Sequence, residues 1–233
     1  MKKSILTLCF VCGLAISQMS VVATEVDLTK DGQMQGYISN IGFKILNSNK
    51  IEKRVTFYYK PDAKAINACS RFRDRGVEVY RGAATYLDNE DEYAAILSHE
   101  ISHGVDSYDG ILRGFFSPVS YGLSPRKFEK KADKRAIDYM VKAGYNPVAF
   151  IVVMNKIMSQ ERYEIFSTHP LTSRRMMYAY EYIYNKYPEY LANNEYKNNV
   201  YYQNFLLTSR ANRTKLQNKI ENPNNKKNKA QYL

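Results

Sequence analysis

Two histidines and a glutamate form the segment of this chain that is best suited to chemistry. His99, Glu100 and His103 read H-E-x-x-H. In a helix the two histidines are four residues apart, so their rings project from adjacent turns on one side. Imidazoles placed in this way can bind one zinc ion at about 2.0–2.1 Å from each nitrogen. Glu100 would lie beside the metal, where it can accept a proton from a water molecule instead of binding the ion.

The surrounding residues favour the helix that this chemistry requires. H-E-x-x-H alone occurs by chance, and a surface helix whose histidines face solvent is the simpler alternative. However, residues 88–91 are Asp, Asn, Glu and Asp, which offer an N-cap and first-turn acids, and residues 92–98 are amphipathic. The chain has three histidines in total, and the third, His169, lies in a loop segment before another predicted helix. We therefore expect the helix to bind metal.

A second predicted helix supplies matching carboxylates. It begins at Pro125 and is stopped by Gly144. Glu129 and Asp133 are four residues apart and share a stripe with the apolar residues Ala132, Ala136, Ile137 and Met140. Buried ionised carboxylates are costly without a cation or donors, so this stripe points to a zinc ion held jointly with the histidines. The alternative is that Glu129 merely lies near an exposed helix end.

The remaining periodicity predicts an α+β fold that is mostly helical, with a small β-sheet. Further helices are expected at residues 31–48, 82–87 and 147–158, and from residue 171 through a tyrosine-rich stretch at 178–184. Strands are expected at residues 55–59, 65–72 and 77–80, with turn residues at 74–76 between the last two. A loop is expected at 104–124, as a connector or as a lid beside the site.

The first 23 residues are typical of a secretory signal peptide. Two lysines precede an apolar run, and small residues lead up to a cleavage position after Ala23. Cleavage leaves Cys69 as the last cysteine, so no internal disulfide is expected. No later segment has the 18 or so consecutive apolar residues of a membrane span. We therefore expect an exported protein, periplasmic or secreted, without an integral membrane span after cleavage.

Much of the excess positive charge lies near the C-terminus. The full chain carries a formal net charge of +11, and from Arg210 onward seven basic residues face one acid, Glu221. We expect a metallopeptidase domain at residues 24–207 and a basic, disordered tail at residues 208–233. The tail could instead contact an anionic surface. Export makes nucleic acid an unexpected partner.

These motifs, taken together and in this order, resemble one known family. The segments are H-E-x-x-H at 99–103, E-x-x-A-D at 129–133 and H-P-x-x-x-x-R at 169–175. They are similar to those of the HtpX and CAAX prenyl protease family of zinc metallopeptidases, and the chain is closest to its soluble exported BepA type. The resemblance covers about residues 31–187. The chain lacks the spanning helices of the intramembrane members, which argues against prenyl-protein processing, and the helical repeat domain of the BepA type.

The resemblance implies a zincin-like metallopeptidase domain of the gluzincin class, with one Zn²⁺ per chain. It implies His99, His103 and Glu129 as metal ligands and Glu100 as general base. It also implies Asp133 as a carboxylate that orients a ligand histidine. It implies that His169 approaches the zinc, where it could cap the metal or stabilise an oxyanion. Arg175 would lie near the same pocket, and either residue could assist the oxyanion.

We interpret the chain as a zinc-dependent metalloendopeptidase that acts on unfolded or extended exported polypeptides. The strand with Val77, Val79 and Tyr80 is expected to be a sheet edge to which an extended substrate adds. Such backbone pairing suits protein quality control outside the cytoplasm. Two alternatives remain: a non-cleaving zinc-binding chaperone or assembly factor that uses the same cleft, and a surface-binding protein that acts through its basic tail.

Overall fold

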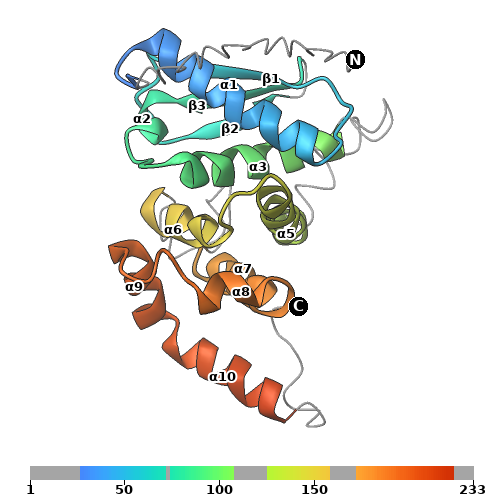
Figure 1. Ribbon diagram of the computed structural model, residues 1–233, viewed down its shortest axis with the longest axis vertical. Coiled ribbons are helices and arrows are strands. Elements are labelled where there is room, and N and C mark those ends of the chain that lie inside the picture. The colour runs from blue at the N-terminus through green and yellow to red at the C-terminus, as the bar shows by residue number, and fades with distance from the viewer. Residues whose placement is uncertain (1–26, 72–73, 108–124, 158–171, 223–233) are drawn as a thin grey trace, which may run out of the picture.

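A small sheet packs onto a larger set of helices (Figure 1). The computed structural model describes residues 27–71, 74–107, 125–157 and 172–222. The strands are β1 (Thr56–Lys60), β2 (Ala68–Arg71) and β3 (Gly76–Tyr80). The helices are α1 (Asp31–Ser48), α2 (Arg81–Ala84), α3 (Glu90–Ser107), α5 (Pro125–Lys142), α6 (Val148–Ile157), α7 (Thr172–Lys186), α8 (Pro188–Ala192), α9 (Val200–Thr208) and α10 (Arg210–Glu221). The predicted α+β class, mostly helical, is confirmed.

The sheet has the order β1-β3-β2, so β3 is its central strand. β1 runs parallel to β3 and β2 runs antiparallel to it. The prediction that Val77, Val79 and Tyr80 form an edge for substrate is therefore wrong. Both sides of β3 are already paired, and the side chains of Val77 and Val79 are fully buried. The sheet edges are β1 and β2 instead.

Helix α1 covers β1. Its apolar stripe is buried as predicted and comprises Met34, Ile38, Ile41 and Ile45. The side chain of Gln35 also reaches the outer edge of β1. Its Nε2 donates to the carbonyl oxygen of Phe57 at 2.9 Å, and its Oε1 accepts from the backbone N–H of Tyr59 at 2.7 Å. This amide pairs with β1 as a neighbouring strand would, which satisfies backbone groups that an edge strand otherwise leaves open.

Helix α3 lies in the middle of the molecule, with the sheet and α1 on one side and α5 and α6 on the other (Figure 1). Its start follows the predicted capping chemistry. The Oδ1 atom of Asn89 accepts the Glu92 N–H at 3.1 Å, and Glu92 Oε2 accepts the Asp88 N–H at 3.1 Å. This reciprocal arrangement is a variant of the capping box, which satisfies free N–H groups at a helix start. The cap fixes where the H-E-x-x-H segment begins its turns.

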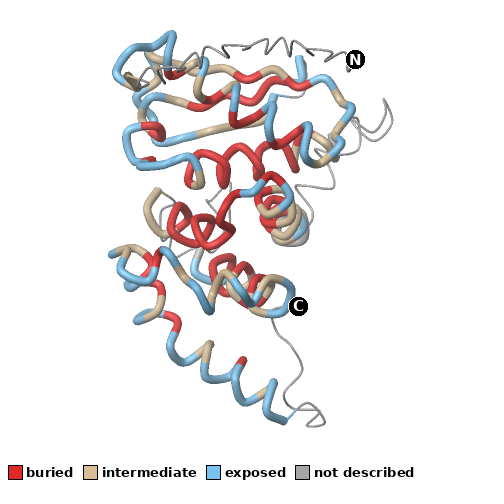
Figure 2. Tube along the Cα trace, viewed as in Figure 1, coloured by how far each residue is buried: buried red, intermediate tan, exposed pale blue. Residues whose placement is uncertain are grey.

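Helices α5 and α6 complete the core beneath α3 (Figure 2). Helix α5 ends at Lys142 and is stopped, as predicted, by Gly144, whose φ of 77° is in the left-handed region. The Tyr145 N–H donates to Met140 O at 2.9 Å and the Gly144 N–H to Val141 O at 3.0 Å, which is a Schellman ending. Helix α6 is buried at every residue from Val148 to Met154. These anchors hold α5 in register beside α3.

The C-terminal part differs from the prediction. The tyrosine-rich stretch is helical, as expected, within α7. Residues 210–221 were expected to be disordered but form helix α10, because Leu216 is buried and Lys219 pairs with the buried Glu181 of α7 at 3.1 Å. The rest of the expected tail, residues 223–233, lies outside the described residues. None of the helices in the described ranges is long and apolar enough to cross a membrane.

Candidate metal centre

The two histidines of α3 lie side by side on its buried face. His99 is 3% exposed, and its Nε2 is 3.1 Å from the Nε2 of His103. The rings meet edge to face with centroids 4.6 Å apart, as expected for residues four apart in a helix. The ring of Phe150, from α6, lies 6.1 Å from that of His99 and closes one side of the site. The histidine pair therefore faces a protected interior, which argues against the solvent-facing alternative.

Helix α5 places a carboxylate against both rings. Glu129 is 1% exposed, with Oε2 at 3.5 Å from His99 Nε2 and Oε1 at 3.3 Å from His103 Nε2. The predicted buried stripe of α5 is thus present, and it includes Glu129 itself. Possible ligand atoms of His99, His103 and Glu129 all lie within 4.8 Å of one another. The sequence-predicted ligand set is brought together from two helices.

The spacing of these atoms suits a tetrahedral zinc ion. Two ligands about 2.0–2.1 Å from zinc, at a tetrahedral angle, lie roughly 3.3–3.4 Å apart. Here the two Nε2 atoms are 3.1 Å apart, and they lie 3.5 and 3.3 Å from different oxygens of the Glu129 carboxylate. Two imidazoles and one carboxylate are also the donor types that zinc uses in catalytic sites. The residues present therefore fit a zinc ion without rearrangement of the helices.

Two further buried residues hold these donors in place. Asp133, one turn after Glu129 on α5, has Oδ1 at 3.1 Å from His99 Nδ1. Arg175, near the start of α7, donates from Nε and Nη2 to the two Asp133 oxygens at 2.8 and 2.6 Å. Its Nη1 also lies 2.9 Å from Glu129 Oε2. A carboxylate on the far nitrogen of a ligand histidine fixes the ring orientation, and a bidentate guanidinium fixes the carboxylate.

The prediction that Arg175 assists an oxyanion finds no support in this geometry. Its side chain is 4% exposed and directs its donors to Asp133 and Glu129. Its Nη2 also lies 3.4 Å from His99 Nε2, so the geometry places Arg175 as a positioning residue directly against the ligand set. Another arginine, Arg135 of α5, donates from Nη1 to the Ser102 carbonyl oxygen at 3.2 Å. No sequence signal marked that bond, because it depends on how closely α5 approaches α3.

The charges of the site are unequal. Burial alone would lower the pKa of His99, but hydrogen bonds to Asp133 and Glu129 raise it to about 10. Burial alone would raise the pKa of Asp133, but Arg175 and His99 hold it below its usual range. The raised pKa of His99 reflects the negative charge around its ring, whereas the lowered pKa of Asp133 reflects the positive charge of the guanidinium beside it. With neutral histidines, Glu100, Glu129 and Asp133 face one guanidinium, so a divalent cation would balance the site.

Glu100 is buried beside the ligand set, at 6% exposed. It follows His99 on α3 and is not one of the three residues of the cluster formed by His99, His103 and Glu129. Its predicted role as general base stays a prediction. His169 lies outside the described residues, so its predicted position by the zinc stays a prediction.

The fold and this site together are of the kind found in zincin-like metallopeptidases: a helix with two histidines and a glutamate, joined by a carboxylate from a following helix. The comparisons with known proteins agree. Residues 107–182 match the family model described as Peptidase family M48. This range begins just after the histidine pair and contains Glu129, Asp133 and Arg175.

Curated relatives extend the similarity. The chain is 24% identical over 190 residues to the beta-barrel assembly-enhancing protease of Escherichia coli K12, and 26% identical to the protein of that name from Yersinia pestis. Each match covers 64% of this chain and 39% of the relative, so the similarity spans well under half of those proteins. Together the matches confirm the predicted resemblance to this family of peptidases.

Proposed function

We propose that this protein is a zinc-dependent metalloendopeptidase that hydrolyses extended segments of exported polypeptides. The observation that carries the proposal is that possible ligand atoms of His99, His103 and Glu129 lie close together at a spacing that suits zinc. Asp133 and Arg175 hold these side chains in place. These three side chains would hold one Zn²⁺ per chain. When bound, the ion polarises the scissile carbonyl and makes a neighbouring water molecule easier to deprotonate.

The proton transfers are assigned to Glu100. Its carboxylate accepts a proton from the attacking water and delivers it to the nitrogen of the leaving amine, a role typically worth about 10²–10⁴-fold in rate. Asp133 keeps the His99 ring oriented through Nδ1 and is itself held by Arg175. His169 is the residue that we assign to the developing oxyanion, on the strength of the H-P-x-x-x-x-R segment alone.

Strand β2 is the best-supported edge for substrate. The Tyr80 N–H donates to Asn67 O at 3.1 Å, so the antiparallel alternation turns the backbone groups of Ala68 and Ser70 away from β3. The other edge, β1, is already covered by Gln35. Helix α3 packs against β2. Burial raises the pKa of the Cys69 thiol, and the charge of Glu100 adds to that shift, so this edge lies near the proposed general base.

A substrate strand added to β2 would be recognised mainly through its backbone. Such recognition requires an extended segment but little particular sequence, which suits unfolded or misassembled chains. Together with the signal-peptide-like first 23 residues, this supports a role in protein quality control in the periplasm or outside the cell. The curated relatives are named as a protease that enhances β-barrel assembly, which is compatible with that setting.

The proposal is tested by metal analysis combined with digestion of an unfolded protein. The purified protein should contain about one zinc per chain and should cleave reduced casein. A chelator should stop the cleavage, and added zinc should restore it. Glu100→Gln should keep the zinc and its thermal stability, with cleavage reduced about 10²–10⁴-fold. Absence of zinc, or full cleavage by Glu100→Gln, would contradict the proposal.

The same variant separates a peptidase from a non-cleaving chaperone. In cells that need this protein, Glu100→Gln should behave like a deletion if hydrolysis is the function. Complementation by Glu100→Gln would favour a binding role for the same cleft. Loss of bound zinc in that variant would leave the comparison without meaning, so zinc content is measured on the same preparation.

A further inference from the structure

A second concave site lies at the opposite end of the molecule from the sheet, between α7, α9 and α10 (Figure 1). It is a groove of about 420 Å³. Its lining includes Tyr180, Tyr184, Leu206, Leu207, Arg210 and Leu216. The metal centre uses α3, α5 and the first turn of α7, whereas this groove uses the later turns of α7. The two sites share one helix but no side chain.

Tyrosines and leucines form one part of the groove lining, beside polar residues of α10. Tyr180 packs against Phe205, with ring centroids 5.5 Å apart, and Leu216 is buried at the base of α10. Leu207, by contrast, is 77% exposed at the rim. An aliphatic side chain that stays in water beside a recess has apolar area that a ligand can cover.

The rim of the groove is cationic. Arg213 is fixed in place, since its Nε donates to Ser209 Oγ at 3.1 Å and its Nη2 to the Leu206 carbonyl oxygen at 2.8 Å. Arg210 is exposed and makes no hydrogen bond or ion pair through its side chain with the residues that the structure describes. Helix α10 carries four basic residues and one acid. A guanidinium with open donors suits a carboxylate.

We propose that this groove binds a polypeptide segment in which a bulky apolar side chain is flanked by carboxylates. The apolar side chain would enter between the tyrosines and leucines, and a carboxylate would pair with Arg210. A recess of this size holds a side chain, whereas an anionic membrane would favour a protruding apolar face. If the proposed peptidase function holds, the groove is an auxiliary site that grips a substrate chain away from the scissile bond.

Binding is measured on the full-length Glu100→Gln protein, so that the probe stays intact. The probe is a fluorescein-labelled octapeptide with a central Phe flanked by Asp and Glu. Fluorescence anisotropy measures its binding. Arg210→Glu and Leu207→Ser should each weaken binding about tenfold or more, equivalent to about 1.4 kcal/mol. The matched controls are Lys215→Glu on α10 and Val200→Ser on α9, which change the same residue classes outside the groove lining. They should stay within about twofold of the parent.

Several results would overturn the inference. An equal loss with Lys215→Glu would mean general attraction to a basic helix, and unchanged binding of a Phe→Ser probe would remove the apolar subsite. Binding to phosphatidylglycerol vesicles but not to the peptide, with the same dependence on Arg210, would assign the rim to membranes. Circular dichroism checks that each variant keeps its helices. Because binding is read without hydrolysis, failure of the casein assay leaves this test intact, and the reverse also holds.

Discussion

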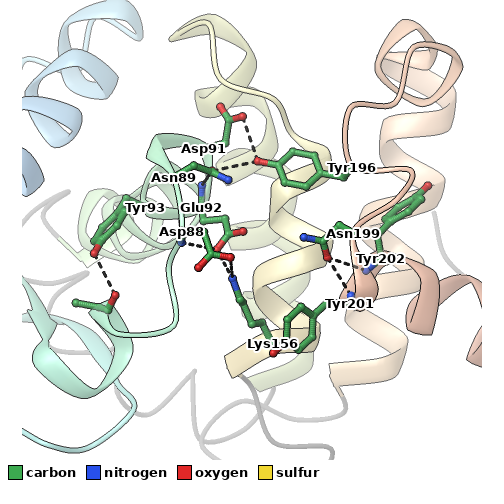
Figure 3. Close-up of polar contacts among 11 residues, drawn as sticks. Asp88, Asn89, Asp91, Glu92, Tyr93, Lys156, Tyr196, Asn199, Tyr201 and Tyr202 are labelled. Carbon is green, nitrogen blue, oxygen red and sulfur yellow. Dashed lines mark hydrogen bonds and ion pairs between the residues drawn. The ribbon is translucent and has the colours of Figure 1, made fainter. Parts of the chain in front are cut away.

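Helix α3 carries two buried charge clusters, and they are balanced in different ways. Near its start, Glu92 is fully buried and its Oε2 lies 2.9 Å from the Nζ of Lys156, from α6; the same Nζ lies 2.6 Å from Asp88 (Figure 3). One lysine thus compensates the charge of the one buried acid. Further along the same helix, the metal centre sets three buried acids against Arg175.

This difference separates a structural cluster from a functional one. A buried charge persists only where something compensates it. The Glu92 cluster is compensated within the chain, and it ties the start of α3 to α6. With neutral histidines, as metal binding requires, the cluster at His99 reaches balance with an added divalent cation. The comparison therefore predicts that the first cluster can be replaced by uncharged residues, whereas the second cannot be changed without loss of zinc.

The largest effect is expected from Arg175→Met. This change strands Asp133 and Glu129 as buried carboxylates without their guanidinium, which should lower the free energy of unfolding by about 3–5 kcal/mol in the metal-free protein. Arg175→Lys keeps the charge but loses the bidentate contact, so its free energy of unfolding should lie between those of the parent and of Arg175→Met. Urea denaturation measures both. Arg174→Met is the matched control, since Arg174 is the exposed neighbour. Equal midpoints for the Arg174 and Arg175 variants would contradict the role given to Arg175.

The next largest effect is expected from Lys156→Met. This change should lower the free energy of unfolding by about 3 kcal/mol, because Glu92 then loses its cation. Adding Glu92→Gln should recover most of the loss, since an amide oxygen can still accept the Asp88 N–H. Zinc content should be unchanged throughout. Failure of the double variant to recover stability, or loss of zinc in it, would show that the two ends of α3 are not independent.

The pH dependence of this pair has a definite sign. Burial alone would lower the pKa of Lys156, but Asp88 and Glu92 raise it above the ordinary value. A cation with a raised pKa contributes stability that is complete below its unfolded pKa, about 10.4, and is lost as pH rises through the folded value. The stability difference between the parent and Lys156→Met should therefore be constant from about pH 7 to pH 9 and should shrink above about pH 10.5.

A smaller effect is expected from Asp133→Asn. The amide still reaches His99 but no longer carries the charge that favours a ligating imidazole, so zinc affinity should fall about 10–100-fold. Competition with a fluorescent zinc chelator gives the affinity. Asp138→Asn is the control on the same helix, because Asp138 accepts hydrogen bonds from Tyr182, Lys186 and Tyr187 and contacts none of the proposed ligands. An equal loss of affinity in both variants would point to α5 as a whole.

Local signals predicted the helices and the ligand set well. Helix α1 was expected at residues 31–48, the bounds that the structure shows, because its apolar stripe is regular. Glu129 was recognised because an acid on an apolar stripe needs a partner, and a partner set at metal spacing is present. Both inferences use residues within a few turns of one another, so periodicity and the cost of burial were enough.

Signals that depend on distant contacts were missed. Strand β1 pairs with β3, which begins sixteen residues after β1 ends. Nothing in the strand sequences indicates which strand is central in the sheet. Helix α10 reads as a polar tail until Leu216 and Lys219 find α7. Gly42 in α1 is similar: a Cβ there would lie 2.4 Å from the Phe57 ring, a contact that only the packed structure reveals.

The corrected sheet order leads to the smallest effect. In Ser70→Pro the outward N–H of β2 is lost, while the ladder to β3, which uses Cys69 and Arg71, is kept. A substrate strand would lose one backbone hydrogen bond, so kcat/KM for an unfolded substrate should fall about 2–10-fold, equivalent to about 0.5–1.5 kcal/mol. Zinc content and the thermal midpoint should stay near the parent values. Ser70→Ala, which keeps the N–H, should cleave as the parent does; if it falls as far as Ser70→Pro, the side chain rather than the strand edge recognises the substrate.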